Sequence, residues 1–338
     1  MTSETDRLKI FAEIVERNGR ESLEKATLEI LNSRYNGGAV SSAAKYHAMF
    51  LRRVTPISQA LISLSCEAAG GKKGKATNIA AAISLLIEAS NVHDDIIDQT
   101  AIKYSRKTVF GKFGADIALL VGDVLLAKGT MLLCQESEKL PEERKNAILE
   151  TTFQTLVKVS KSVALETKMR KNLSVTPQDY LEVIKLKASA PEAHCKIGGN
   201  LGNGSDKVIQ ALGYYGRTYG LVGTVVDEFM DFLDYDKFRG RLENECLPLP
   251  LLYALENSGI RKEIEPLIKD LGLTKKHKNK IVGIVLRSEE VQRLRKDIIL
   301  LAEEEVEQMK KNKPNKATSD LIKLLEIVKE FLHSGWVG

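Results

Sequence analysis

Cysteine, proline and tryptophan are scarce in this 338-residue chain, which contains four, eight and one of them, respectively. The cysteines are far apart, so no C-x-x-C pair exists for a structural metal or a redox disulfide. Scattered thiols in a chain of this length are typical of a reducing compartment rather than of a disulfide-stabilised secreted protein. Alternating β-branched runs closed by Asn-Gly or Asp-Gly turns are nearly absent, so strands are not expected.

Neither sign of charge dominates, because 50 basic and 45 acidic residues give a net charge of +5. This balance gives no indication of a nucleic-acid partner or a membrane surface. Glu88 and Asp123 interrupt the longest apolar stretches, so stable membrane insertion is not expected. The N-terminus is charged and no apolar run follows it, so we expect no signal peptide. These features predict a soluble, cytoplasmic protein.

Long segments repeat apolar residues at three- and four-residue spacing, for example 79–92, 117–133, 181–197 and 281–309. This period is typical of amphipathic helices. Thr176 followed by Pro177 is a helix-start signal, and Pro191 predicts a break after Lys187. No internal repeat, linker or low-complexity block divides the chain. The sequence therefore predicts an all-α protein that forms one large helical domain over residues 1–338.

Two acidic clusters end helices that are otherwise poor in charge. The clusters are Asp94, Asp95 and Asp98, and then Asp227, Glu228 and Asp231. In each, the first and last carboxylates share a helix face and the middle one flanks them, so they repel one another. Mg²⁺ neutralises such carboxylates, and it prefers one or two of them together with water and phosphate oxygens. Either cluster alone could be a solvated helix end, but two of matching spacing favour metal sites that hold a diphosphate.

Several motifs occur in a characteristic order along the chain. They are Ala89-Ser90-Asn91-Val92-His93-Asp94-Asp95-Ile96-Ile97-Asp98, Phe113-Gly114, Val121-Gly122-Asp123-Val124-Leu125-Leu126-Ala127, Tyr180 with Lys187-Ala188-Ser189, Tyr219-Gly220-Leu221 before the second cluster, and Leu249-Pro250-Leu251-Leu252-Tyr253-Ala254-Leu255 after it. Over about residues 40–258 the chain resembles the trans-isoprenyl diphosphate synthases, the polyprenyl synthetase family. The resemblance implies a large helical bundle around a central cavity, with the acidic motifs facing each other at its mouth, and a homodimer.

The resemblance also implies a reaction and a set of site residues. The expected enzyme is a prenyltransferase that condenses an allylic diphosphate with isopentenyl diphosphate, with three Mg²⁺ ions bridging the allylic diphosphate to the acidic motifs. The metal ligands implied are Asp94, Asp98 and Asp227, supported by Asp95, Glu228 and Asp231. Lys187 and Thr224 would be the catalytic residues, with Lys187 contacting the diphosphate.

The site for isopentenyl diphosphate departs from the family pattern. Thr55, Ile87 and Tyr104 stand where the family has basic or hydrogen-bonding residues, and a diphosphate needs charge-assisted donors. The remaining basic residues that could rebuild the site are Arg52, Arg53, Lys103 and Arg106. Those that could replace a lysine missing beside Cys246 are Lys237, Arg239 and Arg241. The erosion leaves two alternatives open: a cyclase or lyase that ionises an allylic diphosphate without this partner, and a non-catalytic subunit of a heteromeric synthase. The intact carboxylates argue against the second.

The expected product length depends on residues just before the first acidic cluster. The resemblance implies that short-product relatives stop chain growth with an aromatic side chain there, whereas this chain has the small residues Ala89 and Ser90. An open channel would need its floor on a neighbouring helix, for which Met131 is the candidate. The resemblance thus implies a product of twenty carbons or more. The alternative is that the small residues only pack a buried helix.

Overall fold

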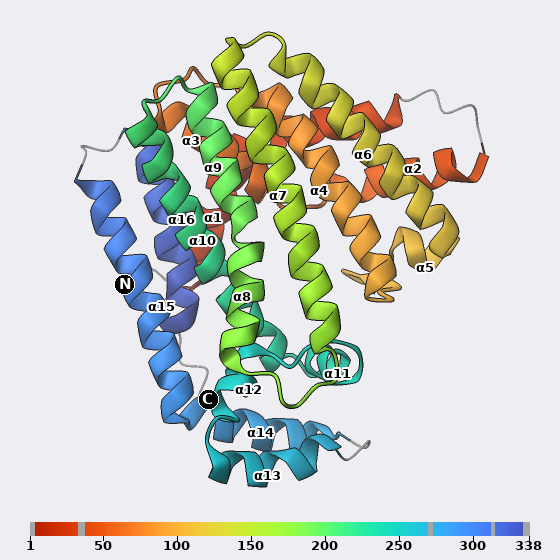
Figure 1. The fold of residues 1–338 in the computed structure, drawn as a ribbon, viewed down its shortest axis with the longest axis vertical. Coiled ribbons are helices and arrows are strands. Elements are labelled where there is room, and N and C mark those ends of the chain that lie inside the picture. Colours follow the sequence, from red (N-terminus) through yellow and green to blue (C-terminus); the bar gives the residue numbers. More distant parts are fainter. Residues whose placement is uncertain (1–3, 33–37, 270–272, 312–314, 334–338) are drawn as a thin grey trace. The chain divides into compact units, whose positions relative to one another are not determined.

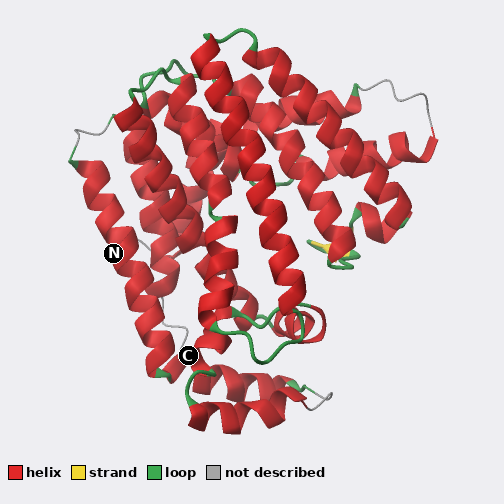
Figure 2. Ribbon diagram, in the orientation of Figure 1, coloured by secondary structure: helices red, strands yellow, loops and turns green. Residues whose placement is uncertain are grey.

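The computed structural model describes residues 4–32, 38–269, 273–311 and 315–333. Figure 2 shows helices almost throughout these residues, with one short strand pair, which confirms the all-α fold. The helices of the N-terminal half are α1 Glu4–Leu31, α2 Gly38–Leu51, α3 Ile57–Ala68, α4 Thr77–Ile97, α5 Val109–Phe113, α6 Ala115–Ser137 and α7 Glu142–Met169. Those that follow are α8 Pro177–Lys187, α9 Ser189–Leu201, α10 Asp206–Leu233, α11 Tyr235–Asn244, α12 Leu249–Ala254, α13 Ser258–Lys269, α14 Lys275–Arg287, α15 Glu289–Lys310 and α16 Lys316–His333.

The chain forms two compact units, each assembled from segments that are distant in the sequence. The first contains Met1–Phe153, Ala193–Gly213 and Asn315–Leu321. The second contains Gln154–Glu192, Tyr214–Pro314 and Ile322–Gly338. The first acidic cluster belongs to the first unit and the second cluster to the second unit. The single domain over residues 1–338 stays a prediction.

In the first unit, α4 and α6 lie side by side and pack closely (Figure 1). Glycines make this close approach possible. A Cβ atom on Gly122 would lie 2.1 Å from Nε2 of His93, and one on Gly129 would lie 2.7 Å from Cδ2 of Leu86. A Cβ at either position would force the His93 ring or the Leu86 side chain to move, so the two glycines allow α6 to pack closely against α4 near the acidic cluster.

A short hairpin follows the first acidic cluster. Its strands, β1 Ile102–Lys103 and β2 Arg106–Lys107, pair antiparallel with Lys103 opposite Arg106. The two residues of the loop, Tyr104 and Ser105, have φ angles of 50° and 59°, and positive φ at both central positions is what a tight hairpin turn requires. The hairpin therefore brings two basic side chains to the end of α4.

In the second unit, α8 starts and stops as the sequence predicts. The Thr176 side chain accepts a hydrogen bond from the Asp179 backbone N–H, and the Asp179 side chain accepts one from Thr176 in return, which is the capping box. Helix α8 ends at Lys187 and α9 begins at Ser189, two residues before Pro191. Helix α10 approaches this junction, since a Cβ on Gly220 would lie 3.0 Å from Cα of Ala188.

One described helix, α6, is apolar and long enough to cross a membrane by length and composition, and 39% of its apolar window is buried in the protein. A core helix of a soluble protein meets the same criteria. The α4-facing side of α6, which includes Val121 and Leu125, is buried in the core of the first unit.

Candidate active site

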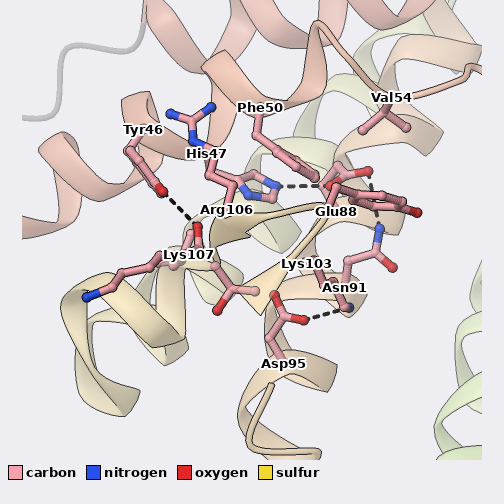
Figure 3. A pocket seen from close by; sticks show the side chains of 13 residues that line it. Tyr46, His47, Phe50, Val54, Glu88, Asn91, Asp95, Lys103, Arg106 and Lys107 are labelled. Carbon is pink, nitrogen blue, oxygen red and sulfur yellow. Dashed lines mark hydrogen bonds and ion pairs between the residues drawn. The ribbon is translucent and has the colours of Figure 1, made fainter. Parts of the chain in front are cut away.

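The first acidic cluster borders a pocket in the first unit (Figure 3). The pocket has a volume of about 180 Å³. Its lining includes Asp95 and Glu88 from α4, Phe50 from α2, and Lys103 and Arg106 from the hairpin. An acidic wall thus meets a basic one, which is an arrangement that suits an anion held beside metal-binding carboxylates.

Lys103 and Asp95 join these two walls. Nζ of Lys103 lies 2.6 Å from Oδ1 of Asp95, but this oxygen has no partner in hydrogen-bond geometry, so the contact is a close ion pair. Burial raises the pKa of Asp95, and Lys103 opposes that rise. Burial would lower the pKa of Lys103, but the facing carboxylates of Asp95, Asp94 and Asp98 raise it above its ordinary value. Lys103 therefore stays charged at the edge of the cluster.

A buried pair of His47 and Glu88 also lines the pocket, and the sequence analysis did not identify it. Nε2 of His47 lies 3.0 Å from Oε2 of Glu88, and both side chains are less than a tenth exposed. Asn91 donates a second hydrogen bond to Glu88, at 3.3 Å. Glu88 is the one charged residue within the apolar part of α4, and a buried carboxylate needs a partner. That signal was available in the sequence, although it could not name His47.

The structure brings two of the four residues predicted for the isopentenyl diphosphate site to this pocket. Lys103 and Arg106 line it, and the Arg106 guanidinium lies 4.5 Å from the centre of the Tyr46 ring. Arg52 and Arg53 are exposed on the turn after α2 and are not among the lining residues. The prediction for Arg52 and Arg53 thus finds no support in the placement of their side chains.

In the second cluster, Glu228 is buried and its carboxylate is engaged by protein groups. It accepts hydrogen bonds from Arg241, from the Tyr180 hydroxyl at 2.8 Å and from the Leu249 backbone N–H at 2.9 Å. Only 4% of Glu228 is exposed. These contacts use both carboxylate oxygens and give Glu228 a structural role; that it also supports a metal ion stays a prediction.

The other two carboxylates of this cluster reach solvent. Oδ1 of Asp231 lies 2.6 Å from Nζ of Lys237. The carboxylate of Asp227 makes no ion pair or hydrogen bond with any described residue. Although part of Asp227 is exposed, surrounding protein atoms remove enough of its hydration, with help from Asp231, to raise its pKa to about 6. A nearby cation would therefore stabilise the charged form of Asp227. Arg239, predicted to bind substrate, instead pairs with Glu243 at 2.6 Å on the surface.

Lys187 and Thr224, predicted as catalytic, are both half-buried in the second unit. Nζ of Lys187 lies 2.6 Å from Oε2 of Glu166 on α7. The Thr224 hydroxyl donates to the Gly220 carbonyl in its own helix, at 2.8 Å. Sequence reasoning did not identify Glu166, because its partners Tyr180 and Lys187 lie on the next helix, and spacing within one helix cannot reveal such a contact.

The described residues contain no preformed group of three or more His, Cys, Asp or Glu side chains that could hold a metal ion within a unit. The donors themselves suit Mg²⁺, because Asp94, Asp98 and Asp227 offer hard carboxylate oxygens. The first cluster lies at the C-terminal end of α4, with Asp98 as the cap residue. The negative end of a helix dipole adds to the repulsion there and favours a cation.

The three residues predicted to set product length lie in different surroundings. Ala89 is buried in the core of the first unit. Ser90 is half-buried and its hydroxyl donates to the Leu86 carbonyl at 3.2 Å. Met131 is 53% exposed on α6, away from the α4-facing side of that helix, so its placement does not support it as a floor beside Ala89.

Comparison with known proteins identifies the family. The chain matches the model of the polyprenyl synthetase family over residues 54–285. A short chain isoprenyl diphosphate synthase from Methanothermobacter thermautotrophicus is 30% identical over 273 residues, which are 79% of each chain. A geranylgeranyl diphosphate synthase from Sulfolobus acidocaldarius is 27% identical, over 71% of this chain and 69% of its own.

Solved structures share the fold. A geranylgeranyl pyrophosphate synthetase from Pyrococcus horikoshii superposes with a TM-score of 0.83 at 22% identity, covering 95% of this chain and 98% of its own. A polyprenyl synthase from Caulobacter crescentus, complexed with calcium and isoprenyl diphosphate, gives a TM-score of 0.78 at 19% identity, covering 94% and 97%. On the family match and the 30% identical relative, this chain belongs to the polyprenyl synthetase family.

Proposed function

We propose that the protein is a prenyltransferase that joins an allylic diphosphate to isopentenyl diphosphate and makes a product of twenty carbons or more. The observation that carries this proposal is the pocket where the first acidic cluster meets Lys103 and Arg106. The names of the two sequence relatives support the reaction, and the geranylgeranyl diphosphate synthase among them supports the length. The comparisons do not favour the cyclase, lyase and non-catalytic alternatives.

In the proposed reaction, the allylic carbon–oxygen bond breaks and pyrophosphate leaves with the bonding electrons. The double bond of isopentenyl diphosphate attacks the allylic cation, and loss of a proton completes the new chain. Asp94, Asp98 and Asp227 would hold Mg²⁺, three ions in all, which would supply charge stabilisation to the leaving pyrophosphate. Asp95 and Asp231 keep Lys103 and Lys237 at the edges of the two clusters, and Lys187 offers a further cation to the diphosphate.

We also propose a homodimer in the cytoplasm. Helix α6 exposes Leu119, Leu120 and Met131 at 51%, 47% and 53%. Exposed apolar side chains on one helix favour an interface with another protein surface. A second copy of the chain would cover them.

The test is turnover with Mg²⁺, labelled isopentenyl diphosphate and each allylic diphosphate, followed by sizing of the products. We expect consumption of isopentenyl diphosphate. We also expect Arg106→Ala to raise its KM much more than that of the allylic substrate, because uniform binding lost from one substrate appears in KM. Lys185→Ala, which removes an exposed cation on α8, is the control and should change neither KM. Release of pyrophosphate without any use of isopentenyl diphosphate would replace this proposal with the cyclase or lyase.

A further inference from the structure

Five side chains in the second unit form a continuous polar network. From the solvent side inwards they are Lys187, Glu166, Tyr180, Glu228 and Arg241. Lys187 pairs with Glu166 at 2.6 Å, and the Tyr180 hydroxyl lies 3.0 Å from Glu166 and 2.8 Å from Glu228. Arg241 donates to both Tyr180 and Glu228, at 2.8 and 3.0 Å. Arg241 also pairs with Asp231 and Glu245, at 3.5 and 3.3 Å, and the end of the network that carries Lys187 is partly exposed.

The hydrogen-bond donors in this network are distributed so that Lys187 is the main partner of Glu166. Tyr180 has a single hydroxyl proton, and two carboxylates compete for it. Arg241 occupies the tyrosine oxygen from the other side and also satisfies Glu228. Glu228 therefore has three donors, whereas Glu166 has the ammonium of Lys187 and a share of one hydroxyl. The charge on Glu166 is directed at Lys187.

We propose that Glu166 is a positioning residue for prenyl transfer, which holds the ammonium of Lys187 in one place to meet the diphosphate. This inference rests on the proposed function for the contact between Lys187 and the diphosphate. The pair itself, and its anchorage through Tyr180 to Glu228 and Arg241, rest on the structure alone.

The surroundings of Lys187 explain why it needs this partner. Its side chain is 34% exposed and that of Glu166 is 20% exposed. Burial on its own would lower the pKa of Lys187, and Arg241 adds to that effect; Glu166 and the more distant Glu228 reverse it and keep the pKa above its ordinary value. A lysine also has a flexible stem, so a fixed carboxylate selects one position of the ammonium. A cation that is already in place stabilises charge that develops on a leaving group.

The test compares Glu166→Gln with Glu182→Gln. Glu182 pairs with Lys185 at 2.6 Å, but both of these side chains are 60% or more exposed on α8, so this variant removes a surface pair and leaves the network intact. We expect Glu166→Gln to lower kcat about 100-fold and to change the KM for the allylic diphosphate little. Glu166→Asp should recover part of kcat, and Glu182→Gln should match the wild type. Equal kcat values for the two glutamine variants would overturn the proposal.

A second measurement does not depend on turnover. Acetic anhydride acylates neutral amines, so the labelling rate of Lys187 at fixed pH, followed by mass spectrometry, reports how firmly its proton is held. We expect labelling of Lys187 in Glu166→Gln to be about tenfold faster, which corresponds to one pKa unit, while labelling of Lys185 stays as in the wild type. Unchanged labelling of Lys187 would overturn the proposal. If Glu166→Gln does not fold, Glu166→Asp, whose shorter side chain moves the carboxylate away from Lys187, should give a smaller shift in the same direction. Faster labelling in a protein that never uses isopentenyl diphosphate would support the pair and reject the proposed function.

Discussion

Nη2 of Arg241 lies 3.0 Å from Oε2 and 3.2 Å from Oε1 of Glu228, and both side chains are less than a tenth exposed. Sequence spacing puts Glu228 in the second acidic cluster, but its contacts put it in the protein interior. A buried charge whose partner is removed costs far more than an exposed one. The second cluster therefore has one carboxylate that stabilises the fold, and two that remain available near solvent.

Removal of Arg241 should destabilise the protein strongly. Arg241→Ala leaves the Glu228 carboxylate buried without its cation, and we expect the free energy of unfolding to fall by about 3–5 kcal/mol. Chemical denaturation monitored by circular dichroism measures this change. Arg239 lies two residues before Arg241 and makes only an exposed pair with Glu243, so Arg239→Ala should leave the free energy of unfolding nearly unchanged. Similar losses in both variants would contradict the structural role of the Arg241–Glu228 pair.

One carboxylate of each acidic cluster should be essential for turnover. Asp94→Ala and Asp227→Ala should abolish activity and leave helicity nearly unchanged, because like charges near each other are already repulsive without a cation. The measurement is turnover over a Mg²⁺ titration, with circular dichroism as the check on folding. Wild-type enzyme treated with EDTA should behave like these variants. Full activity of either variant, or of the EDTA-treated enzyme, would rule out the metal sites.

Stability should depend on pH through Asp227. Its pKa is raised from 3.8 to about 6 in the folded protein, so the folded state binds this proton more tightly than the unfolded state does. The stabilisation that comes from this tighter proton binding is present below about pH 3.8 and is lost as the pH rises through about 6. In metal-free buffer, Asp227→Asn should therefore raise Tm more at pH 8 than at pH 5. An equal change in Tm at both values would contradict the raised pKa.

The wall hypothesis for product length can be tested at two neighbouring positions. Ala89 is 1% exposed, so a phenylalanine there overpacks the core and should cost about 1–3 kcal/mol of stability. Ser90 is half-buried and should accept the ring at a lower cost. If this part of α4 borders the growing chain, Ala89→Phe should shorten the product, and Ser90→Phe should do so with less loss of Tm. Products as long as those of the wild type in both variants would show that length is set elsewhere.

Local sequence signals were enough to predict the helices and the position of the first acidic cluster at the end of one of them. Apolar periodicity predicted α4 and α6, and the Thr176 cap and Pro191 predicted both ends of α8, because these signals act within one or two turns. The hairpin at Lys103 was missed because Tyr104 and Ser105 are not typical residues for positive φ.

The pairing of charged side chains could not be predicted, because it depends on which elements meet. Glu228 and Arg241 are 13 residues apart, and Glu88 and His47 are 41 apart. Spacing grouped Glu228 with Asp227 and Asp231, yet its position on the inward side of α10 decided its partner. The same reasoning explains Arg52 and Arg53, which are close to the pocket in sequence but turn towards solvent.

The contact between Gly122 and His93 limits how this enzyme can be redesigned. Since His93 directly precedes Asp94 and its ring fills the space above Gly122, the carboxylates cannot be shifted along α4 without rebuilding α6. In a laboratory selection for altered product length, we therefore expect the active variants to keep the contact between His93 and Gly122. A library that varies the contacting faces of α4 and α6 should yield mostly inactive clones. A library confined to the solvent-exposed faces of these helices should retain function in many members.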